Sequence, residues 1–181
     1  MAGTISPWVE RFVVGIAPGG VVLDVACGGG RNLRAALAAG HRVVSIDRDL
    51  AGVADLAGAA GVRLVQADLE GGQPFPLRGE VFQGVIVTNY LWRPILADIV
   101  GAVAADGVLI YETFALGQER IGRPRNPDFL LRPGELIEAV RGRLTVIAFE
   151  HCRLSEPERV LQRIVAVGAA HPWLESPPAH S

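Results

Sequence analysis

The sequence predicts an α/β protein with a doubly wound, mostly parallel sheet of seven strands and helices on both faces. Short β-branched runs alternate with Ala- and Leu-rich stretches along the chain, and this alternation is typical of a parallel sheet between two helical layers. The run 21–26 is apolar almost throughout, as expected of a central strand buried on both faces. A length of 181 residues fits one domain. We therefore expect a single domain over residues 1–170, followed by a loose C-terminal tail, 171–181.

The expected elements follow one another in alternating order. Apolar and β-branched runs predict seven strands, at 21–26, 42–47, 62–67, 82–88, 107–114, 144–150 and 159–167. Helical spacing of apolar residues predicts five helices, at 8–16, 31–39, 50–60, 94–104 and 134–140. In the helix 31–39, Leu33, Ala36 and Leu37 share one face, and Gly40 stands where the helix should end.

Three further segments lack such a pattern. The segment 70–79 is too rich in Gly and Pro to form a good helix. The segment 115–133 is long, polar and punctuated by Pro and Gly, which is typical of functional or disordered loops. The tail 171–181 holds three prolines. Because ligands bind at the carboxyl ends of the strands in such sheets, we expect the chemistry in the segments that directly follow the strands.

Composition excludes several classes of function. Every basic side chain is an arginine, so there is no lysine for a Walker-type phosphate site, a Schiff base or pyridoxal phosphate. A formal net charge of −2 weighs against a nucleic-acid partner. The four histidines show no ligand spacing, and the distant Cys27 and Cys152 predict neither a disulfide nor a zinc site. With no signal peptide or membrane-spanning run in evidence, we expect a cytoplasmic protein without metal or membrane partner.

The strongest chemical signal is the sequence Asp24-Val25-Ala26-Cys27-Gly28-Gly29-Gly30-Arg31-Asn32. A predicted strand runs into three consecutive glycines, which then open a predicted helix. Glycine lets the backbone turn sharply and lets a ligand approach without a Cβ in the way. The free N–H groups at the start of a helix favour a negatively charged ligand group. The alternative is a glycine-rich turn that binds nothing.

Two acidic residues extend this signal. Asp47 ends the second predicted strand about 20 residues after the glycine loop, where a carboxylate can accept hydrogen bonds from both hydroxyls of a ribose. Asp68 ends the third predicted strand and would face the edge of an adenine. As alternatives, Asp47 could cap the helix that starts near Leu50, and Asp68 could simply begin a turn.

These features resemble the class I S-adenosylmethionine-dependent methyltransferases. The resemblance covers about residues 19–115 by motif, with Ala26 at the first glycine position of the family's first motif, a mild departure because alanine is small. The segment 85–90 resembles the family's fourth motif. The resemblance implies a Rossmann-like methyltransferase fold and S-adenosylmethionine as the cofactor. It assigns cofactor-binding roles to Asp24, Ala26, Gly28, Gly30, Arg31, Asp47, Asp68, Leu69, Asn89 and, on the N-terminal helix, Arg11.

Within the class, the Gly30-Arg31-Asn32 ending of the glycine loop is similar to that of the small tellurite-resistance methyltransferases. That resemblance implies a small, polarisable methyl acceptor. Arg31 is also a candidate partner for the carboxylate of the methionine part of the cofactor.

The segment 89–93 follows the fourth predicted strand and should lie beside the transferable methyl group. It lacks the Asn/Asp-Pro-Pro-aromatic signature of enzymes that methylate amino nitrogens of bases or glutamine. Tyr90 and Trp92 could bind a sulfonium by cation–π contact or shape an acceptor pocket with Arg93. Alternatively, Trp92 packs against the following helix.

Two more candidates follow the fifth predicted strand. Glu112 could orient an acceptor or act as a base, as Tyr90 could, or it could pair with Arg93 or Arg123. The loop 117–129 combines hinges, arginines and an aromatic residue, and we interpret it as a substrate lid. Its candidate substrate residues are Arg123, Asn126 and Phe129, and the alternative is a plain solvated loop.

The sequence therefore predicts methyl transfer from S-adenosylmethionine to a small-molecule acceptor, by a monomer or homodimer that binds no nucleic acid. Three other functions stay open. A nicotinamide-dependent oxidoreductase would need a third glycine where Leu33 stands and a catalytic Tyr-x-x-x-Lys pair, which a chain without lysine lacks. A non-enzymatic S-adenosylmethionine-binding module and an RNA methyltransferase are the other two. Methyl transfer needs mainly alignment of donor and acceptor, so a weak catalytic motif is expected.

Overall fold

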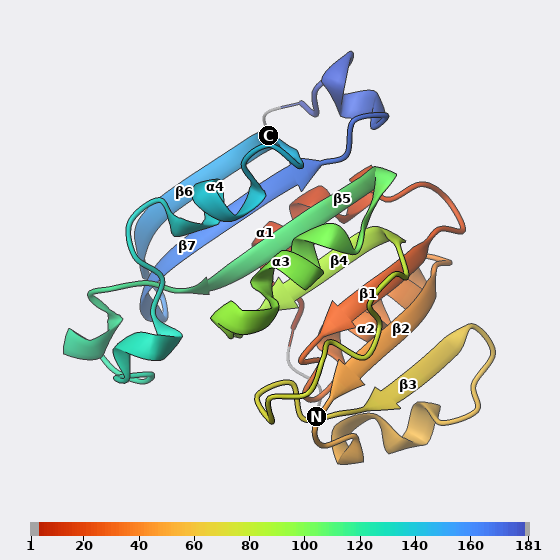
Figure 1. Ribbon diagram of the computed structural model, residues 1–181, viewed down its shortest axis with the longest axis horizontal. Helices are drawn as coiled ribbons and strands as arrows, with labels where there is room; N and C mark the ends of the chain where they lie inside the picture. The colour runs from red at the N-terminus through yellow and green to blue at the C-terminus, as the bar shows by residue number, and fades with distance from the viewer. Residues whose placement is uncertain (1–3, 180–181) are drawn as a thin grey trace.

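A computed structural model describes residues 4–179 and contains the expected seven-stranded sheet (Figure 1). The strands lie in the order β3-β2-β1-β4-β5-β7-β6. Strands β1 to β5 run parallel to one another, and β7 is antiparallel to both β5 and β6. The bounds are β1 Val21–Val25, β2 Arg42–Asp47, β3 Val62–Gln66, β4 Phe82–Thr88, β5 Val103–Phe114, β6 Thr145–Ser155 and β7 Glu158–Val167. The predicted fold class is confirmed.

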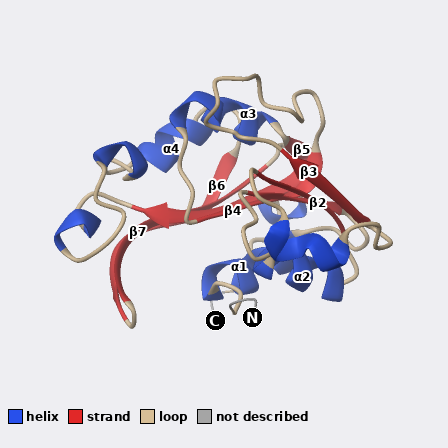
Figure 2. Ribbon diagram, turned by 90° about the horizontal axis from the view of Figure 1, so that it is seen from below, coloured by secondary structure: helices blue, strands red, loops and turns tan. Residues whose placement is uncertain are grey.

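Helices cover both faces of the sheet (Figure 2). One face carries α1 Pro7–Phe12, the 3-10 turn η1 Val13–Gly15, α2 Arg31–Ala38 and the 3-10 helix η2 Ala51–Leu56. The other carries η3 Arg93–Ile95, α3 Leu96–Gly101 and α4 Glu135–Val140. Short 3-10 turns lie outside these layers at η4 Gln118–Arg120, η5 Pro127–Phe129 and η6 Pro172–Leu174.

Each face of the sheet buries its own hydrophobic cluster. Alternate residues of a strand point to opposite faces, so Tyr111 of β5 packs with Leu136 of α4, while its neighbour Ile110 packs with Leu33 of α2 and Trp8 of α1. The central strands are consequently buried on both sides, as their nearly continuous apolar sequences predicted.

Several elements differ from their predicted bounds. Only 51–56 of the predicted helix 50–60 is helical, as a 3-10 helix, because Gly52 and Gly58 lower helix propensity and Gly58 has a positive φ of 78°. β5 begins at Val103, which pairs with Phe82, so the predicted helix 94–104 ends early. β6 continues to Ser155 because it forms a long hairpin with β7. Pairing partners far along the chain decided these strand ends.

The start of the C-terminal segment is packed, contrary to the expected loose tail. The ring of His171 is 3% exposed, its Nε2 lies 2.9 Å from the carbonyl oxygen of Gly15, and its Nδ1 accepts from the backbone N of Trp173. Trp173 stacks edge-on against Phe12 of α1. An aromatic cluster formed with the N-terminal helix therefore outweighs the proline content. Within residues 4–179, no helix has the length and apolar character needed to cross a membrane.

Candidate functional site

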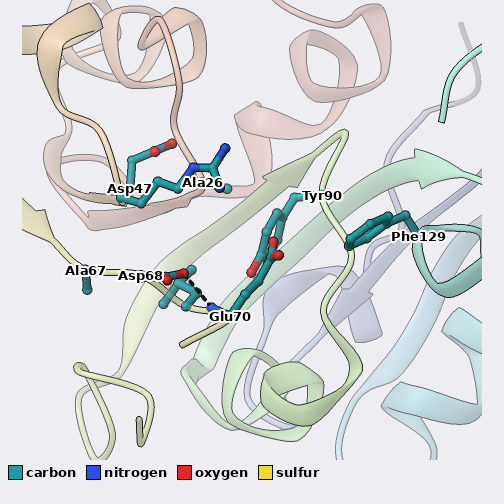
Figure 3. Close-up of a pocket in the computed structure, with 9 residues that line it drawn as sticks. Ala26, Asp47, Ala67, Asp68, Glu70, Tyr90 and Phe129 are labelled. Atoms are coloured by element: carbon teal, nitrogen blue, oxygen red, sulfur yellow. Dashed lines mark hydrogen bonds between the residues drawn. The ribbon is translucent and has the colours of Figure 1, made fainter. Parts of the chain in front are cut away.

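A cavity of about 410 Å³ opens at the carboxyl ends of β1 to β4 (Figure 3). Most of its lining comes from residues at or just after strand ends, as expected for such a sheet. The lining residues are Ala26, Asp47, Arg48, Ala67, Asp68, Leu69, Glu70, Tyr90 and Phe129. Figure 3 shows Ala26 beside Asp47 and Asp68 beside Glu70, with Tyr90 between these pairs and Phe129. The volume lies in the range of about 300–1,000 Å³ that is typical of small-molecule sites.

The glycine loop turns in left-handed backbone conformations. Ala26, Gly28 and Gly30 have φ values of 54°, 50° and 73°. No heavy atom outside their chain neighbours lies within 4 Å of the place where a Cβ would stand on Gly28 or Gly29, so the space above the loop is open. Glycine would suit position 26 for two reasons. It is small, and the left-handed backbone conformation found there is strained for any residue that carries a side chain.

Asp47 joins the glycine loop to the loop after β2. Its Oδ2 accepts a hydrogen bond of 2.8 Å from the backbone N of Gly28, and its Oδ1 accepts one of 3.0 Å from the backbone N of Asp49. Asp47 does not cap η2; the carboxylate bonded to the start of that helix is Asp49, whose Oδ1 accepts from the backbone N of Ala51. Asp47 is left at the cavity wall, with its carboxylate held in place by two backbone donors.

Asp68 both begins a turn and lines the cavity. Its Oδ1 accepts a hydrogen bond of 3.0 Å from the backbone N of Glu70, which fixes the path of the chain after β3. This turn brings the side chains of Leu69 and Glu70 to the cavity wall. The two interpretations of Asp68 are therefore compatible.

A smaller cavity, of about 250 Å³, shares three wall residues with the larger one. Glu70, Tyr90 and Phe129 line both. The remaining lining residues of the smaller cavity are Asn89, Leu91, Thr113, Phe114 and Pro124. The two spaces are thus neighbours, separated by two aromatic side chains and one carboxylate.

Comparison with known proteins finds one matching family model and several solved structures with the same fold. A family model described as a methyltransferase domain matches residues 23–110. TehB from Haemophilus influenzae has the same fold, with a TM-score of 0.69 at 17% identity over 93% of this chain and 63% of that chain. A TehB-like S-adenosylmethionine-dependent methyltransferase from Corynebacterium glutamicum gives a TM-score of 0.65 at 19% identity, covering 92% of this chain and 89% of that one.

A third structure with this fold is the 1,6-didemethyltoxoflavin N1-methyltransferase of Burkholderia thailandensis, with a TM-score of 0.62 at 19% identity over 88% of this chain and 75% of that chain. This chain spans only 63% of the length of the Haemophilus influenzae chain. No curated protein shows significant sequence similarity to this chain.

The segment 23–110 thus resembles a methyltransferase domain, and the fold is that of solved S-adenosylmethionine-dependent methyltransferases. The resemblance drawn from its sequence motifs is confirmed, including the likeness to the tellurite-resistance branch. The larger cavity lies beside Ala26 at the carboxyl ends of the strands, the edge of the sheet at which the sequence predicted a ligand.

Asp24 lies beneath the glycine loop and does not line the larger cavity. It is 1% exposed and accepts hydrogen bonds from Nδ2 of Asn32 and from the backbone N of Leu33. Nδ2 of Asn32 also donates to Oγ1 of Thr88 at the end of β4. Burial raises the pKa of Asp24 from 3.8 to about 7, although both hydrogen bonds lower it. Asp24 thus ties β1, α2 and β4 together under the site, which corrects its expected place at the cofactor.

Arg93, predicted as a substrate residue, lines neither of these two cavities, and its guanidinium donates four hydrogen bonds within the protein. It forms two hydrogen bonds to Glu135, of 2.6 and 3.0 Å, and donates to the carbonyl oxygens of Asp128 and Leu130. These four bonds hold the end of the 115–133 loop against α4. Sequence reasoning missed this role because Glu135 lies 42 residues away along the chain.

Glu112 is also engaged away from both cavities. Its side chain is 2% exposed, accepts a hydrogen bond of 2.8 Å from Oγ of Ser6, and pairs with Arg163 at 3.4 Å. Glu112 does pair with an arginine, but that arginine is Arg163 and neither Arg93 nor Arg123. The reason is that β7 lies antiparallel beside β5 and places Arg163 directly opposite Glu112.

Trp92 and Arg11 likewise lie away from the cofactor cavity. Trp92 lines a separate cavity with Pro74 and Phe75, where it packs against the 70–79 segment. The guanidinium of Arg11 stacks on the ring of Phe12, 4.8 Å from its centroid. The alternative considered for Trp92 was packing against the following helix, and Pro94, Ile95 and Asp98 of that helical segment line the same cavity.

Three other candidates contribute local structure. Arg31 begins α2 without lining either cavity, the carbonyl oxygen of Arg123 accepts from Gln118, and Oδ1 of Asn126 caps η5 through the backbone N of Asp128. From the loop 117–129, only Phe129 and Pro124 line the two cavities.

Sequence reasoning missed several lining residues. Arg48, Ala67 and Glu70 directly neighbour Asp47 and Asp68 in the sequence, so their position after a strand end was a usable signal. Thr113 and Phe114, at the end of β5, offered the same signal. Among the described residues, no group of three or more His, Cys, Asp or Glu side chains is arranged to hold a metal ion.

Proposed function

We propose that the protein transfers the methyl group of S-adenosylmethionine, held in the larger cavity, to a small-molecule acceptor. The single observation that carries this proposal is the pair of adjoining cavities, of about 410 and 250 Å³, that share Glu70, Tyr90 and Phe129. One space suits the cofactor, and the neighbouring space is smaller than the usual drug-sized pocket.

The residues around the larger cavity fit S-adenosylmethionine. The open space above Gly28 and Gly29 allows close approach of a ligand to the backbone. Asp47, held by two backbone donors, has acceptor capacity left for the ribose hydroxyls. Asp68 and Leu69 would face the adenine. When bound, the sulfonium supplies an activated methyl group and its own leaving group, so the protein has to position the acceptor and exclude water.

Several features support a small acceptor. Phe129 and Pro124 bring the 115–133 loop over the smaller cavity, and Arg93 holds that loop in place. The toxoflavin-precursor methyltransferase with this fold binds a small heterocycle together with S-adenosylhomocysteine. The net charge of −2 also disfavours a nucleic-acid substrate. We further propose a cytoplasmic protein that acts as a monomer or homodimer.

Two measurements test the proposal. Titration calorimetry should show binding of S-adenosylhomocysteine and none of NAD. Radiolabelled S-adenosylmethionine should then be supplied with tRNA, total protein extract or a filtered pool of low-mass metabolites. Label is expected mainly in the low-mass pool and should be lost with Asp47→Ala. Transfer mainly into RNA or protein would contradict a small acceptor.

A further inference from the structure

The chemistry of the smaller cavity is defined by one charge and several apolar walls. Among the described residues that line it, Glu70 alone carries a charge. Leu91, Phe114 and Phe129 supply apolar surface, two of them as flat rings. No arginine lines this cavity, and the guanidinium of nearby Arg93 is occupied by Glu135 and two carbonyl oxygens. Such a space attracts flat apolar molecules and repels anions.

The hydroxyl of Tyr90 lies between the two cavities without a hydrogen-bond partner. Its oxygen is buried, and it is one of a few buried side-chain nitrogen or oxygen atoms in residues 4–179 that lack a hydrogen-bond partner. Burial raises the pKa of Tyr90, and the charges of Glu70, Asp68 and Asp47 act in the same direction, so the hydroxyl stays protonated. Buried polar groups normally have a partner. An unpartnered hydroxyl at the wall of a cavity therefore points to a polar group of a ligand.

The position of Glu70 places its carboxylate at the boundary of both spaces. The turn closed by Asp68 directs it there, and Figure 3 shows Glu70 next to Tyr90. Glu70 makes no ion pair within the described part of the chain that would neutralise it. A carboxylate here can accept a hydrogen bond from an acceptor molecule in the smaller cavity.

We propose that the smaller cavity binds a flat, uncharged ring compound with an N–H group, and that Glu70 selects it by accepting that hydrogen bond. This inference rests on the proposed function. An uncharged amine nitrogen keeps its lone pair while its N–H is donated. That lone pair forms the new bond to the methyl carbon as the carbon–sulfur bond breaks and its electron pair stays on sulfur. The nitrogen gains positive charge beside Glu70, which favours the transition state, and then releases its proton to that carboxylate or to water.

Three probes that share two rings test this selection. 1-Naphthylamine carries the amine, naphthalene has no polar group, and 1-naphthoate is an anion. Each is titrated into protein saturated with S-adenosylhomocysteine, and naphthyl fluorescence reports binding. Wild-type protein should bind 1-naphthylamine at least about 10-fold more tightly than 1-naphthoate.

Two variants separate charge from packing. Glu70→Gln should weaken binding of 1-naphthylamine about 10-fold, leave naphthalene unchanged and strengthen 1-naphthoate. Phe129→Leu should weaken all three by about 3- to 10-fold, because it removes a shared aromatic contact. Glu175→Gln, which neutralises an exposed carboxylate of the C-terminal segment, is the matched control and should change nothing.

The outcomes distinguish this inference from the proposed function. If Glu70→Gln leaves the preference for amine over carboxylate intact, Glu70 does not select the acceptor. If it lowers S-adenosylhomocysteine affinity as much as amine affinity, Glu70 belongs to the cofactor site, and the inference is overturned. Failure of wild-type protein to bind S-adenosylhomocysteine at all contradicts the proposed function instead.

Discussion

The glycine-loop side of the larger cavity and the 115–133 loop on its other side are built by different interactions. On the first side, Ala26, Asp47 and Asp68 each lie within two residues of a strand end. On the second, the loop is held by contacts from distant parts of the chain. Arg93 bonds to Asp128 and Leu130, and Gln118 bonds to the backbone N of Val160. The glycine-loop side of the cavity thus follows from local sequence, whereas the 115–133 side depends on long-range polar contacts.

The largest expected effect concerns Asp24, beneath the glycine loop. Its raised pKa means that the folded protein binds more protons than the unfolded chain between about pH 4 and pH 7. The free energy of unfolding should therefore fall as pH rises through this range, by up to about 4 kcal/mol, and level off above pH 7. Urea unfolding from pH 4.5 to 8 measures it.

Asp24→Asn is the control for this pH dependence, because the amide cannot ionise. The decrease between pH 4.5 and 7 should be much smaller in this variant than in wild-type protein. Equal pH profiles for the two proteins would mean that other groups cause the change. Burial of Asp24 would then not make the free energy of unfolding depend on pH.

The next largest effect tests the loop side. Arg93→Met removes two bonds to Glu135 and two to backbone carbonyls, and leaves the largely buried carboxylate of Glu135 with only the more exposed Arg132 as its partner. Breaking such a partly buried pair should lower the free energy of unfolding by about 2–3 kcal/mol and speed proteolysis within 115–133.

Arg78→Met is the matched control for Arg93→Met. Arg78 makes an equally direct pair with Asp98, but its side chain is 64% exposed. Its loss should cost at most about 1 kcal/mol and leave cleavage of 115–133 unchanged. Similar costs for the two variants would show that the loop does not depend on Arg93.

A smaller effect, on ligand affinity, tests the glycine-loop side of the larger cavity. Asp47→Ala should weaken binding of S-adenosylhomocysteine about 10- to 100-fold, because a hydrogen bond to a charged group contributes about 1.5–3 kcal/mol. Calorimetry measures the affinity. Asp49→Ala removes the neighbouring carboxylate, which accepts from the backbone N of Ala51 without lining the cavity, and should change affinity by less than about 2-fold. Equal affinities for both variants would remove Asp47 from the cofactor site.

The smallest effect concerns backbone strain at Ala26. Its φ of 54° is unfavourable for alanine, so Ala26→Gly should raise the free energy of unfolding by about 1 kcal/mol. Ala35→Gly, within α2, should instead lower it by about 1 kcal/mol because glycine destabilises a helix interior. Chemical unfolding of both variants gives the comparison, and a destabilising Ala26→Gly would contradict the strain argument.

The sequence by itself determined the sheet, the order of its elements and the edge of the sheet at which Asp47 and Asp68 line the larger cavity. Periods of apolar residues encode strands and helices locally, and parallel strands bring their carboxyl ends to one edge, so Asp47 and Asp68 could be placed there from sequence alone. Only the tertiary structure decided what Glu112, Arg93 and the C-terminal segment do. Glu112 pairs with Arg163 on an antiparallel strand, Arg93 reaches Glu135, and Trp173 packs on Phe12. An ion pair or aromatic contact depends on distance in space, and no local pattern of residues specifies which distant side chain arrives there.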